Sequence, residues 1–486
     1  MSKRLGNKSP YVTSTPRSFN CGYCYKPTPT PKPLDKCPLL PKDTPYQLCS
    51  PWPQNGGIYN TNTRLSPFPV SPNASLFRQS PFDGGTIISF AAGLIFRANF
   101  NNTPIIDKDG NIYITSTVSL ESGGALQKNG LFIVTDKNGT ITNQFDLIGQ
   151  PVGASCIGSD GFVYFTTVLY GDIIGFPNNK SNLCAYKIGF TSPPIIIYKD
   201  IPGVAWGSPS IDNYGNVCFI STDLTPTGLS NVSNLNIYNI KSKKLRSYEV
   251  PGVANANISI DKNGTYYFTS FFNDAILGIK NGYLNIYKKD SPNTESIDIL
   301  GGPIGSTPAI DNNNDIVYVL SSIGVNNTSY IYTYNIKSQN LQTPVTLSDI
   351  GSSFGSPAMD KDGTIYFTST IFNNSGISTN DSFLNSYKYG FTPQKISVVG
   401  NTLEAFPSID ANGYVYFASF DTTKNDSYLN IYKDGSIKKR IYIEGSSAVS
   451  SPSINSNGWI YLFSNIVSID GNSALRTNQS FLNIIK

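Results

Sequence analysis

The chain has 486 residues, only 14% of them charged, a formal net charge of +4 and no histidine. The lack of histidine excludes a Ser-His-Asp triad, histidine metal ligands and imidazole acid–base catalysis. Catalysis would therefore have to rest on carboxylates, lysine, tyrosine or a cofactor. No apolar run approaches the roughly 20 residues of a membrane-spanning helix. Because Lys3 and Arg4 precede no apolar signal segment, the sequence predicts a soluble chain without a visible signal peptide.

Residues 1–50 form a tail rich in cysteine and proline. Residues 1–72 hold 14 of the 32 prolines, and the run KPTPTPKP at 26–33 favours an extended, polyproline-like chain. Four of the seven cysteines have the spacing C-x2-C-x12-C-x11-C: Cys21, Cys24, Cys37 and Cys49. We expect them to form disulfides, within the tail or between chains. A zinc site is the alternative, although the second pair lacks the usual ligand spacing, and a redox role for the first pair is a third reading.

The basic charge gathers at the N-terminal end. Residues 1–85 contain ten basic and three acidic residues. Charges this dispersed favour a solvated, flexible segment. Contact with nucleic acid, lipid or an acidic partner is the alternative, and we consider nucleic acid the less favoured partner. Residues 51–85 are interpreted as a lead-in or linker.

One sequence motif then occurs eight times along the chain. Clear copies read SPSIDNYGNVCFIS from Ser208 and SPAMDKDGTIYFTS from Ser356. The position that most copies fill with aspartate falls at Asp107, Gly158, Asp212, Asp261, Asp311, Asp360, Asp410 and Asn455. The copies lie about 50 residues apart, a period typical of propellers and related arrays.

Each copy predicts four strands. An apolar run leads into an Asp-x-x-Gly turn, which suits a tight hairpin, and two further β-rich stretches and a polar turn complete most units. Four strands in about 50 residues make one propeller blade. The last unit ends at Lys486 after its third strand, and a spare strand at 86–90 precedes the first unit. We therefore predict an all-β, eight-bladed β-propeller over 86–486, in which this N-terminal strand closes the last blade.

The lead-in and the repeats resemble PQQ-like propellers. The segments WPQNGG at 52–57 and NTNTRLSPF at 60–68 are similar to the lead-in of that superfamily, and the repeat is similar to its SPxIDxxGxIY pattern. The superfamily includes quinoprotein alcohol dehydrogenases and outer-membrane assembly scaffolds. The resemblance implies the fold, and much less an activity.

The dehydrogenase features are absent from the sequence. No tryptophan-docking motif recurs, since only Trp52, Trp206 and Trp459 occur, and no two cysteines are adjacent. The pairs Asp107/Asp109 and Asp360/Asp362 imitate the start of a calcium loop, but the later ligands are missing, so a hairpin turn is favoured. We assign no catalytic, cofactor-binding or metal-binding residue.

The tail has a second resemblance. A basic Cys/Pro-rich segment joined to an enzyme-like domain is similar in architecture to surface-fibril proteins of mimivirus-type giant viruses. This resemblance implies a place on the virion surface, with the four tail cysteines serving in crosslinking or assembly. Sequons such as those at Asn73, Asn231, Asn263 and Asn425 leave glycans open.

Taken together, these features predict a non-enzymatic structural or surface component that self-associates as a homo-oligomer or filament. The alternatives are a PQQ-dependent or sugar-related enzyme with an axial pocket, and a protein-interaction scaffold. The stretches 118–129 and 371–382 interrupt the blade pattern and are expected to be rim loops. With the mouth of the central channel, they are the places where recognition is expected. The recurring tyrosines, such as Tyr113, Tyr366 and Tyr416, are expected to pack between blades.

Overall fold

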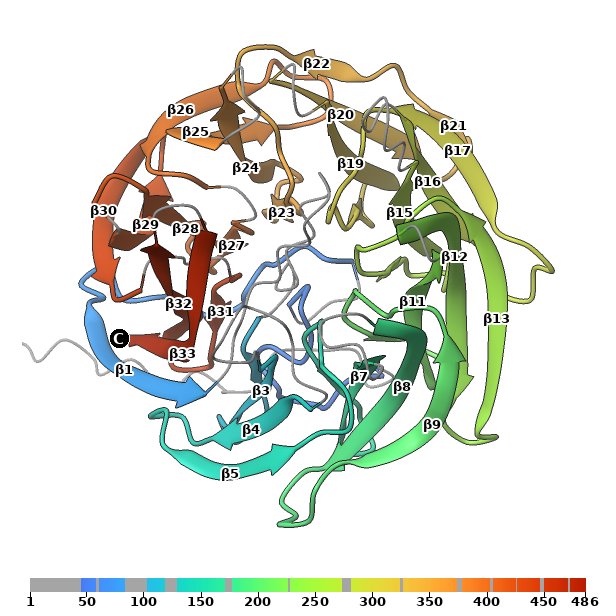
Figure 1. Cartoon of the computed structure of the whole chain (residues 1–486). Helices are drawn as coiled ribbons and strands as arrows, with labels where there is room; N and C mark the ends of the chain where they lie inside the picture. Colours follow the sequence, from blue (N-terminus) through green and yellow to red (C-terminus); the bar gives the residue numbers. More distant parts are fainter. Residues whose placement is uncertain are drawn as a thin grey trace, which may run out of the picture. The chain divides into compact units, whose positions relative to one another are not determined.

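The computed structural model describes residues 45–57, 61–83, 103–118, 129–170, 177–225, 228–272, 281–323, 327–373, 378–402, 405–424, 426–445, 450–470 and 473–486. These residues form strands and turns, with no helix among them, and belong to one structural unit, 37–486. Eight antiparallel sheets are arranged around a ring, so the predicted eight-bladed β-propeller is confirmed (Figure 1). No helix of the described residues is long and apolar enough to span a bilayer.

The blades follow one another in chain order, each with its first strand innermost. Blades 1 to 4 comprise β2 (Ile105–Ile106), β3 (Ile112–Ser116), β4 (Leu131–Thr135) and β5 (Ile141–Asp146); β6 (Cys156–Ile157), β7 (Phe162–Tyr170), β8 (Pro177–Lys187) and β9 (Ile195–Pro202); β10 (Ser210–Ile211), β11 (Asn216–Thr225), β12 (Gly228–Asn239) and β13 (Lys244–Pro251); and β14 (Ser259–Ile260), β15 (Tyr266–Phe271), β16 (Asn281–Tyr287) and β17 (Glu295–Leu300).

Blades 5 to 8 repeat the arrangement, although the fourth strand of blade 5 is split in two. They comprise β18 (Ala309–Asp311), β19 (Ile316–Ile323), β20 (Thr328–Asn335), β21 (Asn340–Leu341) and β22 (Val345–Leu347); β23 (Ala358–Met359), β24 (Ile365–Phe372), β25 (Ser378–Tyr387) and β26 (Gln394–Val399); β27 (Ser408–Ile409), β28 (Val415–Asp421), β29 (Asp426–Lys433) and β30 (Ser436–Ile443); and β31 (Ser453–Ile454), β32 (Ile460–Asp470) and β33 (Ser473–Ile485).

The ring is closed by β1 (Leu76–Asp83), which supplies the outer strand of blade 8. It pairs antiparallel with β33, in a register that runs from Leu76 opposite Ile485 to Asp83 opposite Gln479. Closure by an N-terminal strand is thus confirmed, but the strand chosen from the sequence is wrong. The predicted strand at 86–90 lies outside the described residues. The actual strand contains Pro81, which a sheet tolerates at an edge because proline donates no ladder hydrogen bond.

The repeated aspartates build the turn between the first two strands of a blade. In blade 1, Asp107 Oδ1 accepts the backbone amides of Asp109 (2.9 Å) and Asn111 (2.8 Å). Gly110 has φ 87°, a conformation that a side chain would strain. In blade 2, Asp160 takes over from the glycine at 158 and accepts the amide of Phe162. As predicted, these residues are turn formers.

The recurring tyrosines pack between blades and also bond these turns. Tyr113 is buried and donates its hydroxyl hydrogen to Asp107 Oδ2 at 2.9 Å, six residues earlier in the chain. Tyr267, Tyr366 and Tyr416 donate in the same way to the turn aspartate of their own blades. The stripe is therefore structural, and it ties the second strand of a blade to the turn before it.

Three cysteines lie inside the blades, as the sequence predicts for small apolar residues. Cys156, Cys184 and Cys218 are buried and carry free thiols. Burial raises the pKa of each thiol, so none is a thiolate at neutral pH.

Candidate functional site

The site at the ring axis is occupied by the chain's own residues 45–57 and 61–70, called the axial segment below. In Figure 1 this blue segment runs across the centre of the ring of blades. Each inner strand has an apolar residue just before the turn position, and the backbone amides of most of these residues bond the axial segment. Six of these amides donate to the axial segment: Ile106 to Trp52 O, Ile157 to Pro53 O, Ile211 to the Tyr46 hydroxyl, Ile310 to Thr61 O, Met359 to Thr63 O and Ile409 to Arg64 O, over 2.8–3.1 Å.

The two remaining inner strands lack this bond. Among the hydrogen bonds of the described residues, none joins the amides of Ile260 in blade 4 or Ile454 in blade 8 to the axial segment. Blade 8 contacts the segment through a side chain instead, because Arg64 donates from Nη1 to Ser451 Oγ. The axial segment therefore bonds directly to seven of the eight blades, although it is irregular and contains no strand.

Apolar anchors fix the segment between these bonds. Trp52 is fully buried, and Phe68 and Val70 are nearly so. Tyr46 is 1% exposed, donates to Gln54 Oε1 at 2.6 Å and accepts the amide of Ile211. Burial raises its pKa well above the ordinary value, so it remains a protonated donor.

Arg64 is the most unusual side chain of the segment. It is 0% exposed and has φ 51°. Besides Ser451, Nη2 donates to Asn55 Oδ1 at 3.3 Å, and the guanidinium lies 4.9 Å from the centroid of the Phe406 ring. No carboxylate of the described residues forms an ion pair with it. Burial lowers the pKa of Arg64 to about 9. Among the described residues, this buried cation therefore contacts neutral groups only.

Little space is left beside the segment where it passes blades 3 to 5. A cavity of about 10 Å³ is lined there by Asn55, Asn62, Asn257 and their neighbours. That volume accommodates about one water molecule. Asn62 donates to the carbonyl oxygen of Thr307 at 3.1 Å, which holds the segment against blade 5. This cavity is too small for a quinone or a sugar.

Cys49 lies at the start of the axial segment and is disulfide-bonded. Its neighbours are fixed to the ring, since Gln47 donates its amide to Ile157 O at 3.2 Å and Ser50 donates its hydroxyl to Ile106 O. The other three tail cysteines, Cys21, Cys24 and Cys37, lie outside the described residues, and the choice between disulfides and zinc for them stays a prediction.

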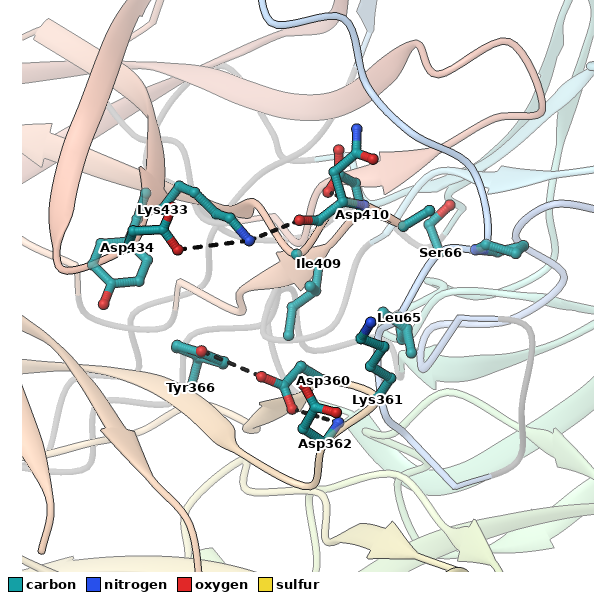
Figure 2. A pocket seen from close by; sticks show the side chains of 15 residues that line it. Leu65, Ser66, Asp360, Lys361, Asp362, Tyr366, Ile409, Asp410, Lys433 and Asp434 are labelled. Carbon is teal, nitrogen blue, oxygen red and sulfur yellow. Dashed lines mark hydrogen bonds and ion pairs between the residues drawn. The ribbon is translucent and has the colours of Figure 1, made fainter.

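A larger pocket, of about 460 Å³, lies between blades 6 and 7 (Figure 2). Asp360 and Asp362 line one side, and Asp410, Lys433 and Asp434 line the other. Clustered carboxylates are typical of metal sites and of acid–base catalysis. Whether these carboxylates are free for either role depends on their hydrogen bonds within the protein.

The two repeat aspartates of this pocket are already engaged. Asp410 accepts the amides of Asn412 and Tyr414 on one oxygen and the amide of Val70 and the Tyr416 hydroxyl on the other, over 2.8–3.2 Å. Burial raises the pKa of Asp410 above its usual range. Asp360 accepts two backbone amides and the Tyr366 hydroxyl. In the described part of the chain, no group of three acidic or cysteine residues is placed to hold a metal ion.

The stretches 118–129 and 371–382, which the sequence predicts to be rim loops, differ in part from that prediction. Residues 371–382 are mostly strand, because β24 continues to Phe372 and β25 starts at Ser378. Strand pairing therefore continues from Thr370 opposite Ser382 to Phe372 opposite Ser378, and residues 374–377 lie outside the described residues. Residues 119–128 of the other stretch also lie outside them.

Sequence reasoning missed the axial segment. It identified 51–85 only as a lead-in, because the segment has neither the period of a strand nor that of a helix. The one available signal was the cluster of Trp52, Phe68 and Val70 in a Pro/Asn/Gly-rich context. Isolated large apolar residues there indicate anchoring rather than a free linker.

Comparisons with known proteins identify no family for the chain. No family model matches the chain, and no curated protein matches it. Among solved structures, the Dos1 propeller is 8% identical to this chain with a TM-score of 0.48, and the alignment covers 77% of this chain and 88% of the Dos1 chain. The polysaccharide lyase Uly1 is 11% identical with a TM-score of 0.41, covering 85% and 99%.

A quinoprotein alcohol dehydrogenase-like protein from Bacteroides thetaiotaomicron is also similar, at 13% identity and a TM-score of 0.39, covering 68% of this chain and 67% of that one. The three neighbours differ in what their names describe. The chain is an eight-bladed β-propeller whose structural neighbours include a quinoprotein dehydrogenase-like protein.

Proposed function

We propose that this chain is a non-enzymatic structural or surface component, in which the propeller is the displayed body and the Cys/Pro-rich tail the attachment. The observation that carries the proposal is the axial segment. The segment bonds to seven blades and buries Trp52 and Arg64 at the ring axis. An enzyme with an axial pocket would need that space for its substrate or cofactor. The repeat aspartates Asp107, Asp360 and Asp410, the last two of which line the pocket of Figure 2, are engaged in turns.

Cys49 supports the attachment role. Disulfides persist in oxidising surroundings such as cell and virion surfaces. A disulfide at Cys49 lies directly next to residues that are bonded to blades 1 and 2. A crosslink at this position would therefore transmit load from the tail to the ring. In its finer form, the proposal places the chain on the surface of a giant-virus particle, as part of its fibril layer.

Immunogold labelling tests this proposal. An antibody against the propeller is applied to intact and to surface-stripped particles of the source. We expect exterior label that stripping removes. Label confined to soluble cell fractions would contradict the virion placement, and a quinone absorption band in the purified protein would contradict the non-enzymatic role.

A further inference from the structure

A second pocket, of about 360 Å³, lies between blades 3 and 4 and has a different character from the pocket of Figure 2. Lys244, Arg246 and Tyr248 alternate along β13, so their side chains leave the same face of the strand. Lys289 and Asp290, in the turn after β16, line the pocket from blade 4. Two neighbouring blades thus bring cations and an aromatic ring to one cavity.

Tyrosines form one wall of this pocket. The rings of Tyr248 and Tyr287 have centroids 4.8 Å apart, and the Tyr287 hydroxyl donates to the Tyr248 hydroxyl at 3.0 Å. Tyr266 lies behind them, with its ring centroid 5.4 Å from that of Tyr287. Burial, reinforced by the bond to Tyr248, raises the pKa of Tyr287, so the Tyr287 hydroxyl is protonated at physiological pH. An aromatic face beside hydroxyl groups suits a ligand that is apolar on one side and polar at its edges.

The cations of the pocket are available to a ligand. Among the described ion pairs, none involves Lys244, Arg246 or Lys289. The Lys289 ammonium makes a cation–π contact 3.6 Å from the centroid of the Tyr214 ring and has no carboxylate partner among the described ion pairs. An exposed guanidinium without a partner is suited to bind a carboxylate or phosphate through two hydrogen bonds.

One of the two acids that line the pocket is bound within the protein and has no free oxygen for a ligand. Asp212, at the floor of the pocket, is fully buried and accepts the amides of Tyr214 and Asn216, the side-chain amide of Asn216 and the Tyr266 hydroxyl. Its oxygens are therefore occupied within the protein. Asp290 is the one other acid among the lining residues, against three cations.

We propose that the pocket between blades 3 and 4 binds an anionic saccharide, a sugar ring that carries a carboxylate or a phosphate. The tyrosine wall receives the ring, and Arg246 with Lys244 and Lys289 receives the anion. A pocket of this volume with few convergent charged groups is typical of small-molecule sites. The inference does not depend on the proposed surface role.

The test is a binding titration of the full chain, followed by saturation-transfer NMR and calorimetry. The probes are glucuronate, glucose 6-phosphate, neutral glucose and inorganic phosphate. We expect glucuronate or glucose 6-phosphate to bind, and Arg246→Gln to weaken that binding at least about tenfold, because a hydrogen bond to a charged group is lost. Arg246 is exposed, so the variant keeps the fold. The matched control is Lys361→Gln in the pocket of Figure 2, which should change nothing.

Each result bears on the proposal. Binding of only one of the two sugar anions supports it and identifies the anion. Glucose binding as tightly as glucuronate would overturn the role of the cations, and inorganic phosphate binding as tightly as glucose 6-phosphate would reduce the pocket to a simple ion site. Equal weakening by the Arg246 and Lys361 variants, or no saturation at millimolar concentrations, would remove the site altogether.

Discussion

The N-terminal region closes the ring at two places, and the two closures are built differently. At the outer edge, β1 pairs in regular register with one neighbour, β33. At the axis, residues 45–57 and 61–70 make between one and four hydrogen bonds to each of seven blades without forming a strand. The outer closure completes a repeating unit, whereas the inner one joins units that otherwise touch only their neighbours. Stability at the axis should therefore depend on the segment as a whole, and stability at the rim on single packed residues.

Removal of the axial segment should have the largest effect. A chain that lacks residues 1–71 keeps β1 but loses the burial of Trp52, Phe68 and Val70. Each fully buried apolar side chain contributes about 1.5–3 kcal/mol, so we expect the free energy of unfolding to fall by about 5 kcal/mol or more. Denaturant unfolding followed by tyrosine fluorescence measures the change.

The matched control lacks residues 1–44 and carries Cys49→Ser. It keeps the whole axial segment, so its stability should stay close to that of the full chain. If both truncations lose the same stability, the tail or the Cys49 disulfide, and not the axial segment, stabilises the ring.

The outer closure is tested by Phe82→Ala. Phe82 on β1 is 8% exposed and packs edge-on against Phe463, with ring centroids 5.6 Å apart. A Phe→Ala change at a buried site lowers the free energy of unfolding by about 3–5 kcal/mol. Because β1 is an edge strand, we expect the loss for Phe82→Ala to lie at the lower end of this range. Phe77→Ala on the same strand is the control, because Phe77 is 54% exposed. Equal melting temperatures for the two variants would show that β1 does not hold blade 8.

These two closures also show what the sequence was able to predict. The missing fourth strand after Lys486 required a strand from the N-terminal end, and the structure confirms that one closes blade 8. The choice of 86–90 was wrong because the apolar run there looks more strand-like than LFRQSPFD, the sequence of β1. An edge strand with one solvent-exposed side needs few apolar residues, and it tolerates Pro81.

The candidate sites were harder to predict, for a physical reason. The turn aspartates were recognised because their partners lie two to six residues away in the chain. Arg64 bonds Ser451, 387 positions later, and no local pattern encodes that contact. The alternation of Lys244, Arg246 and Tyr248 was visible in the sequence, but its meaning depends on Tyr287 of the next blade.

Arg64 tests how the axis tolerates its buried charge. Arg64→Met removes the charge and retains most of the volume, so we expect stability within about 1 kcal/mol of the parent, because the lost hydrogen bonds are offset by the desolvation that is avoided. Arg64→Ala also opens a cavity and should cost about 2–3 kcal/mol more than the Met variant. Thermal unfolding of both at pH 7 gives the difference. If the Met and Ala variants are equally destabilised, the guanidinium bonds, and not packing, hold the segment.

The smallest expected effect is that of one turn bond. Tyr113→Phe removes the 2.9 Å hydrogen bond to Asp107 and should cost about 1 kcal/mol. Tyr366→Phe removes a longer bond, 3.3 Å, from a less buried tyrosine and should cost less. Parallel denaturant titrations of the two variants rank them, and the reverse order would show that packing dominates the stripe.

Amide hydrogen exchange at the inner strands tests the central claim most directly. In the full chain, the amides of Ile106, Ile157, Ile310, Met359 and Ile409 should be protected, while those of Ile260 and Ile454 exchange faster because the axial segment offers them no acceptor. In the chain without residues 1–71, the protected set should exchange as fast as Ile260. Unchanged protection of that set after truncation would show that the axial segment does not seal the ring.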